Sequence, residues 1–120
     1  MLPTKTILII GAGPAGMTAA IQLKRYGIPF VLLEKERVGG LLWNANLVEN
    51  YPGFPAGVSG PKLVHLMEKQ MKRIGVDVTF DSVVRLESAE TGFRVSTLQA
   101  EYKPRFVLVA SGTKPTPSHW

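Results

Sequence analysis

The sequence predicts an α/β fold, in which a parallel sheet with helices is joined by a small antiparallel β-meander. Two stretches indicate this fold. Residues 6–34 read as strand, glycine turn, helix and strand, which is the order of a parallel βαβ unit. Residues 83–102 hold three short runs of β-branched and aromatic residues, which are typical of a meander. The length of 120 residues and the 45% hydrophobic content suit a single domain with one core.

The βαβ unit is predicted from two apolar runs and from a residue that is typical of a helix end. Thr6–Ile10 and Phe30–Glu34 are short, mostly apolar runs, which suit strands buried on both faces. A helix is expected between them, to about Tyr26, and Gly27 fits the left-handed position that ends many helices. Three residues at a spacing of four predict the packed face of this helix: Ala15, Ala19 and Leu23.

The second half of the chain is predicted from the same signals. Val38–Gly60 has no clear period, and a long irregular loop within a compact domain is usually functional. Pro61 suits the first turn of a second helix. The apolar stripe of that helix is formed by Leu63, Met67, Met71 and Ile74. Val76–Phe80 reads as a third parallel strand and Arg105–Ala110 as a further buried strand.

Composition excludes several classes of protein. The 14 Lys and Arg against 9 Asp and Glu give a net charge of +5 without a basic run, so no nucleic-acid partner is expected. No apolar run reaches the length of a membrane span, and the first residues lack the pattern of a secretory signal. Cysteine is absent, which excludes cysteine-based redox chemistry within the chain and is compatible with a reducing cytoplasm.

The side chains offer no convincing catalytic or metal-binding group. The two histidines, His65 and His119, are isolated and do not have metal-ligand spacing. No serine stands in the pattern of a nucleophile elbow. We therefore expect neither a metal site nor a catalytic acid, base or nucleophile. Residues 113–120 are polar and proline-punctuated, so they read as a linker or tail after a domain at residues 1–112.

The chemistry-bearing motif is the glycine turn Gly11-Ala12-Gly13-Pro14-Ala15-Gly16. Gly11 permits a tight turn, Gly13 lets the backbone approach a pyrophosphate, and Gly16 lets the helix pack close to the sheet. The helix N-terminus that follows offers unpaired N–H groups to phosphates. Glu34 ends the second strand and can accept hydrogen bonds from ribose hydroxyls, while it would repel a 2′-phosphate. The motif predicts a dinucleotide site but does not separate NAD from FAD.

A second, more specific pattern follows the turn. From Thr6 to Thr113 the chain resembles the thioredoxin reductase-like family of flavoproteins with two dinucleotide-binding domains. The resemblance rests on Gly39-Gly40-Leu41-Leu42, Val48-Glu49-Asn50-Tyr51-Pro52-Gly53-Phe54-Pro55, Gly60-Pro61 and Ala110-Ser111-Gly112. It implies a Rossmann-like fold, in the N-terminal part of an FAD-binding domain. It also implies hydride transfer from NAD(P)H to FAD and then electron delivery to an acceptor.

The resemblance implies roles for individual residues as well. It places the pyrophosphate of FAD on Gly13–Gly16, the ribose on Glu34, the isoalloxazine beside Gly39–Asn50 and the adenine at the backbone near Val83. Asn50 carries both a donor and acceptors, as recognition of a flavin edge requires. The expected cofactor-binding residues are Gly11, Gly13, Pro14, Ala15, Gly16, Glu34, Lys35, Gly39, Gly40, Leu41, Leu42, Asn46, Asn50, Val83, Ala110, Ser111 and Gly112.

Two departures from the family pattern bear on the acceptor. Leu41 stands where the family usually has a glutamine after the glycine pair, and Trp43-Asn44-Ala45-Asn46 replaces a Thr-rich run. These changes remove hydrogen-bonding groups near the flavin, although Asn46 can restore one. A relative that acts on another acceptor is therefore at least as well supported as a thioredoxin reductase. Trp43 and Tyr51 are expected either to cover a ring face or to pack in the core.

Family members continue into an NAD(P)H-binding domain and then return to complete the FAD domain. We therefore expect this chain to be a fragment or one subunit of a split enzyme, with NAD(P)H bound outside it and no complete catalytic cycle of its own. A sheet without its returning strand has an exposed edge, which predicts a second polypeptide segment or a homo-oligomer. An electron-acceptor protein is a further candidate partner. Two alternatives stay open: a partner-dependent or non-enzymatic nucleotide-binding module, and an NAD-binding dehydrogenase domain.

Overall fold

A computed structural model of the chain describes residues 6–112, and the expected tail at residues 113–120 lies outside them. The helices and strands follow the predicted order, with one 3-10 helix, η1, added in the long loop. They are β1 (Ile7–Ile10), α1 (Pro14–Tyr26), β2 (Phe30–Glu34), η1 (Gly40–Asn44), α2 (Gly60–Arg73), β3 (Val78–Phe80), β4 (Val83–Ala89), β5 (Gly92–Thr97), β6 (Glu101–Tyr102) and β7 (Phe106–Val109).

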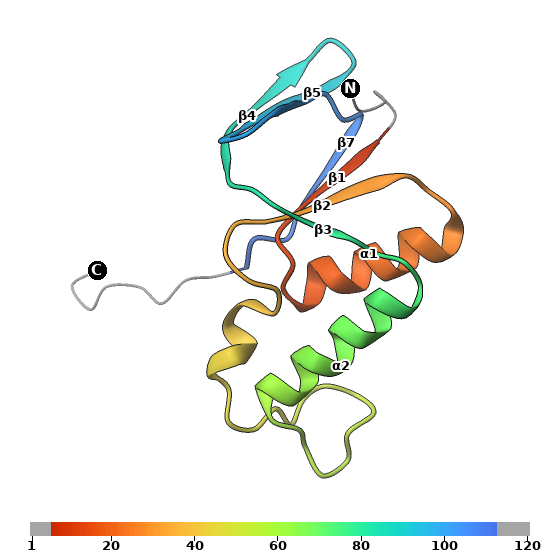
Figure 1. Cartoon of the computed structure of the whole chain (residues 1–120), viewed down its shortest axis with the longest axis vertical. Coiled ribbons are helices and arrows are strands. Elements are labelled where there is room, and N and C mark those ends of the chain that lie inside the picture. Colours follow the sequence, from red (N-terminus) through yellow and green to blue (C-terminus); the bar gives the residue numbers. More distant parts are fainter. Residues whose placement is uncertain (1–5, 113–120) are drawn as a thin grey trace, which may run out of the picture.

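The parallel sheet has the strand order β3-β2-β1-β7, and the meander forms a separate antiparallel sheet in the order β4-β5-β6. The crossovers β1-α1-β2 and β2-α2-β3 step in the same direction across the sheet, so both helices lie on one face. The chain then passes through the meander and returns beside β1 as β7. Figure 1 shows the helices and the meander on opposite sides of the parallel sheet. This strand order brings the carboxyl ends of β2, β1 and β7 to one edge.

The sheet separates two cores, because successive side chains of a strand point to opposite faces. Ile9 and Leu32 face the helices and are fully buried there. Leu8 and Leu33 face the meander, where they pack against Val95 of β5. Both faces of β1 and β2 are thus covered, as their apolar sequences predict. Within residues 6–112, no helix is long and apolar enough to cross a membrane.

The helices have close to the predicted bounds, and the packed face of α1 was predicted in part. Gly27 takes the left-handed conformation (φ 72°) at the end of α1, as expected. Ala19 and Leu23 of the predicted face are partly buried and pack against the core, whereas Ala15 is exposed. The fully buried residues of α1, which the prediction missed, are Gly16, Met17 and Ala20. The physical reason is that α1 approaches the sheet most closely at Gly16. A Cβ built there would lie 1.8 Å from the carbonyl oxygen of Gly11, so this position and Ala20, one turn later, face inward.

Helix α2 has the predicted amphipathic pattern. Pro61 lies in its first turn, and the Ser59 hydroxyl caps it by accepting a hydrogen bond from the Lys62 N–H at 3.2 Å. Leu63, Met67 and Met71 of the predicted stripe are buried, together with Val64. Ile74 follows the last turn and packs against the same core. The period of the sequence was therefore a sufficient signal for this helix.

The prediction of a buried strand is wrong for β7. Its register with β1 places Phe106 and Leu108 on the helix side of the sheet, and Val107 and Val109 on the meander side. Phe106 is 56% exposed and Val109 is 61% exposed. The reason is position: among residues 6–112 no strand pairs with the outer edge of β7, and α1 packs over β1 and β2 instead. β7 has the composition of an interior strand but forms an edge.

Candidate functional site

A cleft of about 810 Å³ lies at the carboxyl ends of β1, β2 and β7. This is where ligands bind in open parallel sheets, and the volume is in the range of small-molecule sites. The lining residues come from the glycine turn, the end of β2, η1 and the end of β7. They are Gly11, Gly13, Pro14, Ala15, Glu34, Lys35, Glu36, Arg37, Gly40, Leu41, Leu42, Asn44, Ala110, Ser111 and Gly112.

The three glycines of the turn meet two different steric demands. Gly11 has φ +108°, and a Cβ there would lie 2.3 Å from the carbonyl oxygen of Ala110. Gly16 is blocked by Gly11 in the same way. A Cβ on Gly13, by contrast, would meet no atom within 4 Å, because Gly13 faces the open cleft. Gly11 and Gly16 therefore allow close packing, whereas Gly13 leaves room for a ligand at the N-terminus of α1.

The carboxylate of Glu34 holds this turn in place. Its Oε1 accepts a hydrogen bond from the Ala12 N–H at 2.8 Å, and its Oε2 accepts one from the Glu36 N–H at 2.9 Å. A carboxylate oxygen can accept more than one hydrogen bond, so both oxygens keep acceptor capacity toward the cleft. Glu34 thus links the end of β2 to the turn after β1 and also presents acceptors to a ligand.

The glycine pair at the start of η1 is packed against the same turn. The Gly39 N–H donates to the Ala12 carbonyl at 2.8 Å, and the indole N–H of Trp43 donates to the Val38 carbonyl at 2.6 Å. Gly39 has φ +109°, and a Cβ there would lie 2.6 Å from a methyl group of Val64 on α2. The backbone of the glycine pair is therefore held between the turn and α2, and it forms one wall of the cleft.

The structure brings together most of the residues predicted for the site. Twelve of them line the cleft: Gly11, Gly13, Pro14, Ala15, Glu34, Lys35, Gly40, Leu41, Leu42, Ala110, Ser111 and Gly112. Gly16 and Gly39 lie behind its walls as packing positions. Asn46, Asn50 and Val83 do not line it. The side chain of Val83 packs against the core on the meander side.

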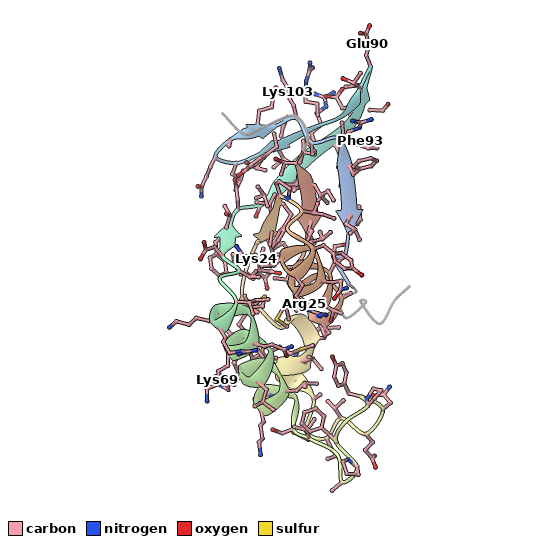
Figure 2. The ribbon with its side chains drawn as sticks, turned by 90° about the vertical axis from the view of Figure 1, so that its right-hand side faces the viewer. Lys24, Arg25, Lys69, Glu90, Phe93 and Lys103 are labelled. Carbon is pink, nitrogen blue, oxygen red and sulfur yellow. The ribbon has the colours of Figure 1, made fainter. Side chains whose placement is uncertain are left out.

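Asn46 and Asn50 belong to the loop of residues 45–59, and both are exposed. A bridge between Val48 and Val58, with N···O distances of 2.6 and 3.0 Å, closes this loop at its base. Tyr51 packs against Phe54 inside the loop, with ring centroids 6.3 Å apart. Figure 2 shows the loop, in yellow-green, at the opposite end of the molecule from Glu90 at the tip of the meander.

Sequence reasoning missed three cleft residues: Glu36, Arg37 and Asn44. Glu36 and Arg37 follow β2 directly, so their distance from the carboxyl end of that strand was a usable signal. Asn44 lines the cleft because η1 turns the chain back toward the glycine turn, which has no signal in the periodicity of the sequence. Among residues 6–112, no three His, Asp or Glu side chains gather closely enough to hold a metal ion.

The donor and acceptor groups of the cleft fit a dinucleotide. The first turn of α1 presents N–H groups beside the open face of Gly13, and Glu34 presents acceptors on one side. The other side is apolar, at Leu41, Leu42 and Ala110. A glycine turn closed on a parallel sheet, with a carboxylate after the second strand and a cleft between them, defines a Rossmann-like α/β domain.

The comparison with known families agrees with this class. Residues 5–119 match the family described as pyridine nucleotide-disulphide oxidoreductase, and the chain belongs to that family. Within the family it is thioredoxin reductase-like, which confirms the resemblance seen in the sequence. It is 36% identical over 112 residues to a thioredoxin reductase of Rickettsia bellii, an alignment that covers 92% of this chain and 36% of that protein.

Solved structures give the same result for the fold. A crystal structure of Lactococcus lactis thioredoxin reductase in the FR conformation matches with a TM-score of 0.87 and 31% identity, over 95% of this chain and 37% of that one. A ferredoxin-flavin thioredoxin reductase from Clostridium acetobutylicum also gives 0.87, with 27% identity, over 97% of this chain and 40% of that one. The chain therefore spans well under half the length of the relatives that it matches.

Proposed function

We propose that residues 1–112 form an FAD-binding domain of an NAD(P)H-dependent oxidoreductase. The observation that carries this proposal is the open face of Gly13 at the N-terminus of α1, beside the carboxylate of Glu34 in the cleft. Helix N-termini stabilise phosphates, and a carboxylate after the second strand accepts hydrogen bonds from ribose hydroxyls. The thioredoxin reductase-like sequence supports FAD as the dinucleotide.

Different residues of the cleft bind different groups of FAD. Gly13–Gly16 bind the pyrophosphate, and Glu34 binds the ribose with Lys35 at its side. The apolar wall flanks the ring system. That wall is formed by Gly40, Leu41, Leu42, Ala110, Ser111 and Gly112. Asn46 and Asn50 supply amide groups from the adjoining loop, and the backbone near Val83 meets the adenine.

The chain's own residues bind and orient the cofactor, and none of them supplies acid, base or nucleophile chemistry. When bound, FAD supplies the redox step, in which it takes a hydride from NAD(P)H and passes electrons to an acceptor. We propose that NAD(P)H binds outside this chain and that the acceptor is a protein. Most side chains of β7 are exposed, and its outer edge pairs with no strand among residues 6–112. These features support a partner that covers β7, either a second polypeptide segment or a second copy of the chain. The absence of cysteine is compatible with a cytoplasmic setting.

The absorption spectrum of the purified chain, recorded after it is mixed with FAD and desalted, tests the proposal. We expect a retained flavin band, which Glu34→Gln weakens because the amide accepts poorly where the carboxylate accepts well. Glu68→Gln is the matched control, because Glu68 lies on α2 outside the cleft. A chain that takes up NADH in preference to FAD would contradict the flavin proposal and favour a dehydrogenase domain.

A further inference from the structure

Arg37 is a cation in the wall of the cleft with an unusual environment. Its guanidinium carbon lies 4.2 Å from the centroid of the Trp43 ring, which is a cation–π distance. Although Glu34 and Glu36 are near in sequence, the ion pairs among residues 6–112 do not include Arg37. Its charge is therefore stacked on an aromatic ring instead of being neutralised by a carboxylate.

Trp43 is itself held in a defined orientation. Its indole N–H donates to the Val38 carbonyl at 2.6 Å, and its ring makes an edge contact with His65 of α2, with centroids 5.5 Å apart at 89°. A Cβ built on Gly39 would lie 2.8 Å from the indole nitrogen, so the ring also closes over the glycine pair. An indole with these contacts offers a stable surface on which a planar guanidinium can stack.

The segment that carries Arg37 is joined to the glycine turn. The Gly39 N–H bonds to the Ala12 carbonyl, and Gly40 lies beside Gly13. The first turn of α1 contains no basic residue, so a phosphate there would meet backbone N–H groups and partial charge only. Among residues 6–112, Lys35 and Arg37 are the two cations that line the cleft. Of these, Arg37 has the aromatic support.

We propose that Arg37, supported by Trp43, binds the pyrophosphate of the dinucleotide and adds a full positive charge to the N-terminus of α1. This inference rests on the proposed function, since it assigns a residue to the same site. A guanidinium presents paired N–H donors that match phosphate oxygens, and stacking on Trp43 reduces the freedom that it loses on binding. Arg37 binds the ligand and takes no part in electron transfer, and Trp43 is the positioning residue that supports it.

The test compares ligands that carry a pyrophosphate with one that does not. Dissociation constants are measured for FAD, ADP and adenosine, by flavin fluorescence for FAD and by NMR shifts for the other two. We expect Arg37→Gln to weaken FAD and ADP by about tenfold or more, the usual loss for a charge-assisted hydrogen bond, and to leave adenosine unchanged. Arg73→Gln is the matched control, because Arg73 is an exposed arginine at the end of α2 outside the cleft, and it should change all three by about twofold or less.

Two further variants separate charge from aromatic support. Arg37→Lys keeps the charge but loses the flat, paired donors, so it should fall between the wild type and Arg37→Gln. Trp43→Leu keeps Arg37 but removes its support, and we expect it to weaken ADP by several-fold. Far-UV circular dichroism and urea unfolding of each variant show whether the fold is kept. The dependence of ADP binding on salt should also become shallower in Arg37→Gln, as one ionic contact is lost.

Three results would overturn the inference. If the wild type binds FAD and Arg37→Gln binds all three ligands as Arg73→Gln does, Arg37 does not bind the pyrophosphate, although the FAD-binding proposal stands. If Arg37→Gln weakens adenosine as strongly as ADP, the contact is with the nucleoside and the pyrophosphate assignment is wrong. If the wild type binds neither FAD nor ADP, the proposed function fails and this inference fails with it.

Discussion

The neighbouring strands β1 and β7 have the same kind of sequence but opposite environments. β1 reads Ile-Leu-Ile-Ile and β7 reads Phe-Val-Leu-Val, and the two pair in parallel along their full length. Leu8 and Ile9 of β1 are completely buried, whereas Leu108 is 42% exposed and most other side chains of β7 are exposed as well. An apolar run therefore predicts a strand, but its burial depends on what lies over both of its faces. Among the described strands of this sheet, the comparison therefore identifies β7 as an edge strand with exposed side chains.

The largest expected effect on stability concerns the contact between α1 and the parallel sheet. Gly16→Ala puts a methyl group 1.8 Å from the Gly11 carbonyl oxygen, so the helix must move away from the sheet. We expect a loss of about 3 kcal/mol or more in the free energy of unfolding, measured by urea denaturation. Gly13→Ala is the control, because its Cβ meets open space. It should cost less than about 1 kcal/mol. Equal losses in both variants would show that α1 does not pack as described.

The next prediction compares the two strands directly. Ile9→Ala opens a cavity in the core on the helix side and should cost about 2–4 kcal/mol in urea unfolding. Leu108→Ala is on the same face of the neighbouring strand but is largely bare, so it should cost less than about 1.5 kcal/mol. If Leu108→Ala costs as much as Ile9→Ala, β7 is covered in solution, and a partner is present in the purified protein.

A third variant tests what the open edge does. Val109→Lys places a charge on the exposed meander side of β7, where the native side chain is apolar. Charged edge residues oppose strand pairing between molecules. We therefore expect the weight-average mass of the chain, measured by sedimentation at high concentration, to fall toward that of the monomer. Glu90→Lys, at the distant tip of the meander, adds a lysine without touching β7 and should leave the mass unchanged.

The smallest effect concerns the core on the meander side. Burial, with the charge of Asp81, raises the pKa of the Tyr102 hydroxyl above its ordinary value of 10.0. In the unfolded chain this proton is lost near pH 10, whereas the folded chain keeps it to higher pH. The stability that Tyr102 contributes is therefore complete below pH 10 and is lost as the pH rises through the folded pKa.

Urea unfolding across this alkaline range checks the sign. The wild type should lose stability more steeply above pH 10 than Tyr102→Phe, which has no phenolic proton to release. The Asp81 carboxylate is held in place by the Ser82 N–H, at 2.8 Å, and by the Thr97 hydroxyl, so its charge stays close to the same core. Parallel pH profiles for the two proteins would contradict the prediction.

The sequence carried enough information for the elements and for most of the cleft. Helix α2 was predicted from its period, and the roles of Gly11 and Gly16 followed from the steric needs of a tight turn. For α1, the contacts of Ala19 and Leu23 with the core were predicted, but the burial of Met17 and Ala20 was not, because it depends on where the helix touches the sheet. The exposure of β7 was not predicted, because an apolar run is typical of a strand with both faces covered.

The missed cleft residues have a related explanation. The place of Arg37 after β2 was a signal for the cleft, but its stacking on Trp43 depends on η1, which the sequence did not predict. Trp43 was assigned either to a ring face or to packing, and the structure shows it packed between Arg37 and His65. Such contacts join residues through tertiary structure, which local patterns do not encode.

The pairing of β1 with β7 also affects the order in which the sheet forms during folding. β1 lies inside the described sheet, but its register joins Ile7 to Phe106, so the first strand described pairs with the last one. Contacts between such distant residues form slowly, because a long stretch of chain must be ordered before they are made. During synthesis the edge of β1 that pairs with β7 therefore stays unpaired while the helices and the meander form. The centre of this sheet is completed late, and any partner that covers β7 can dock only afterwards.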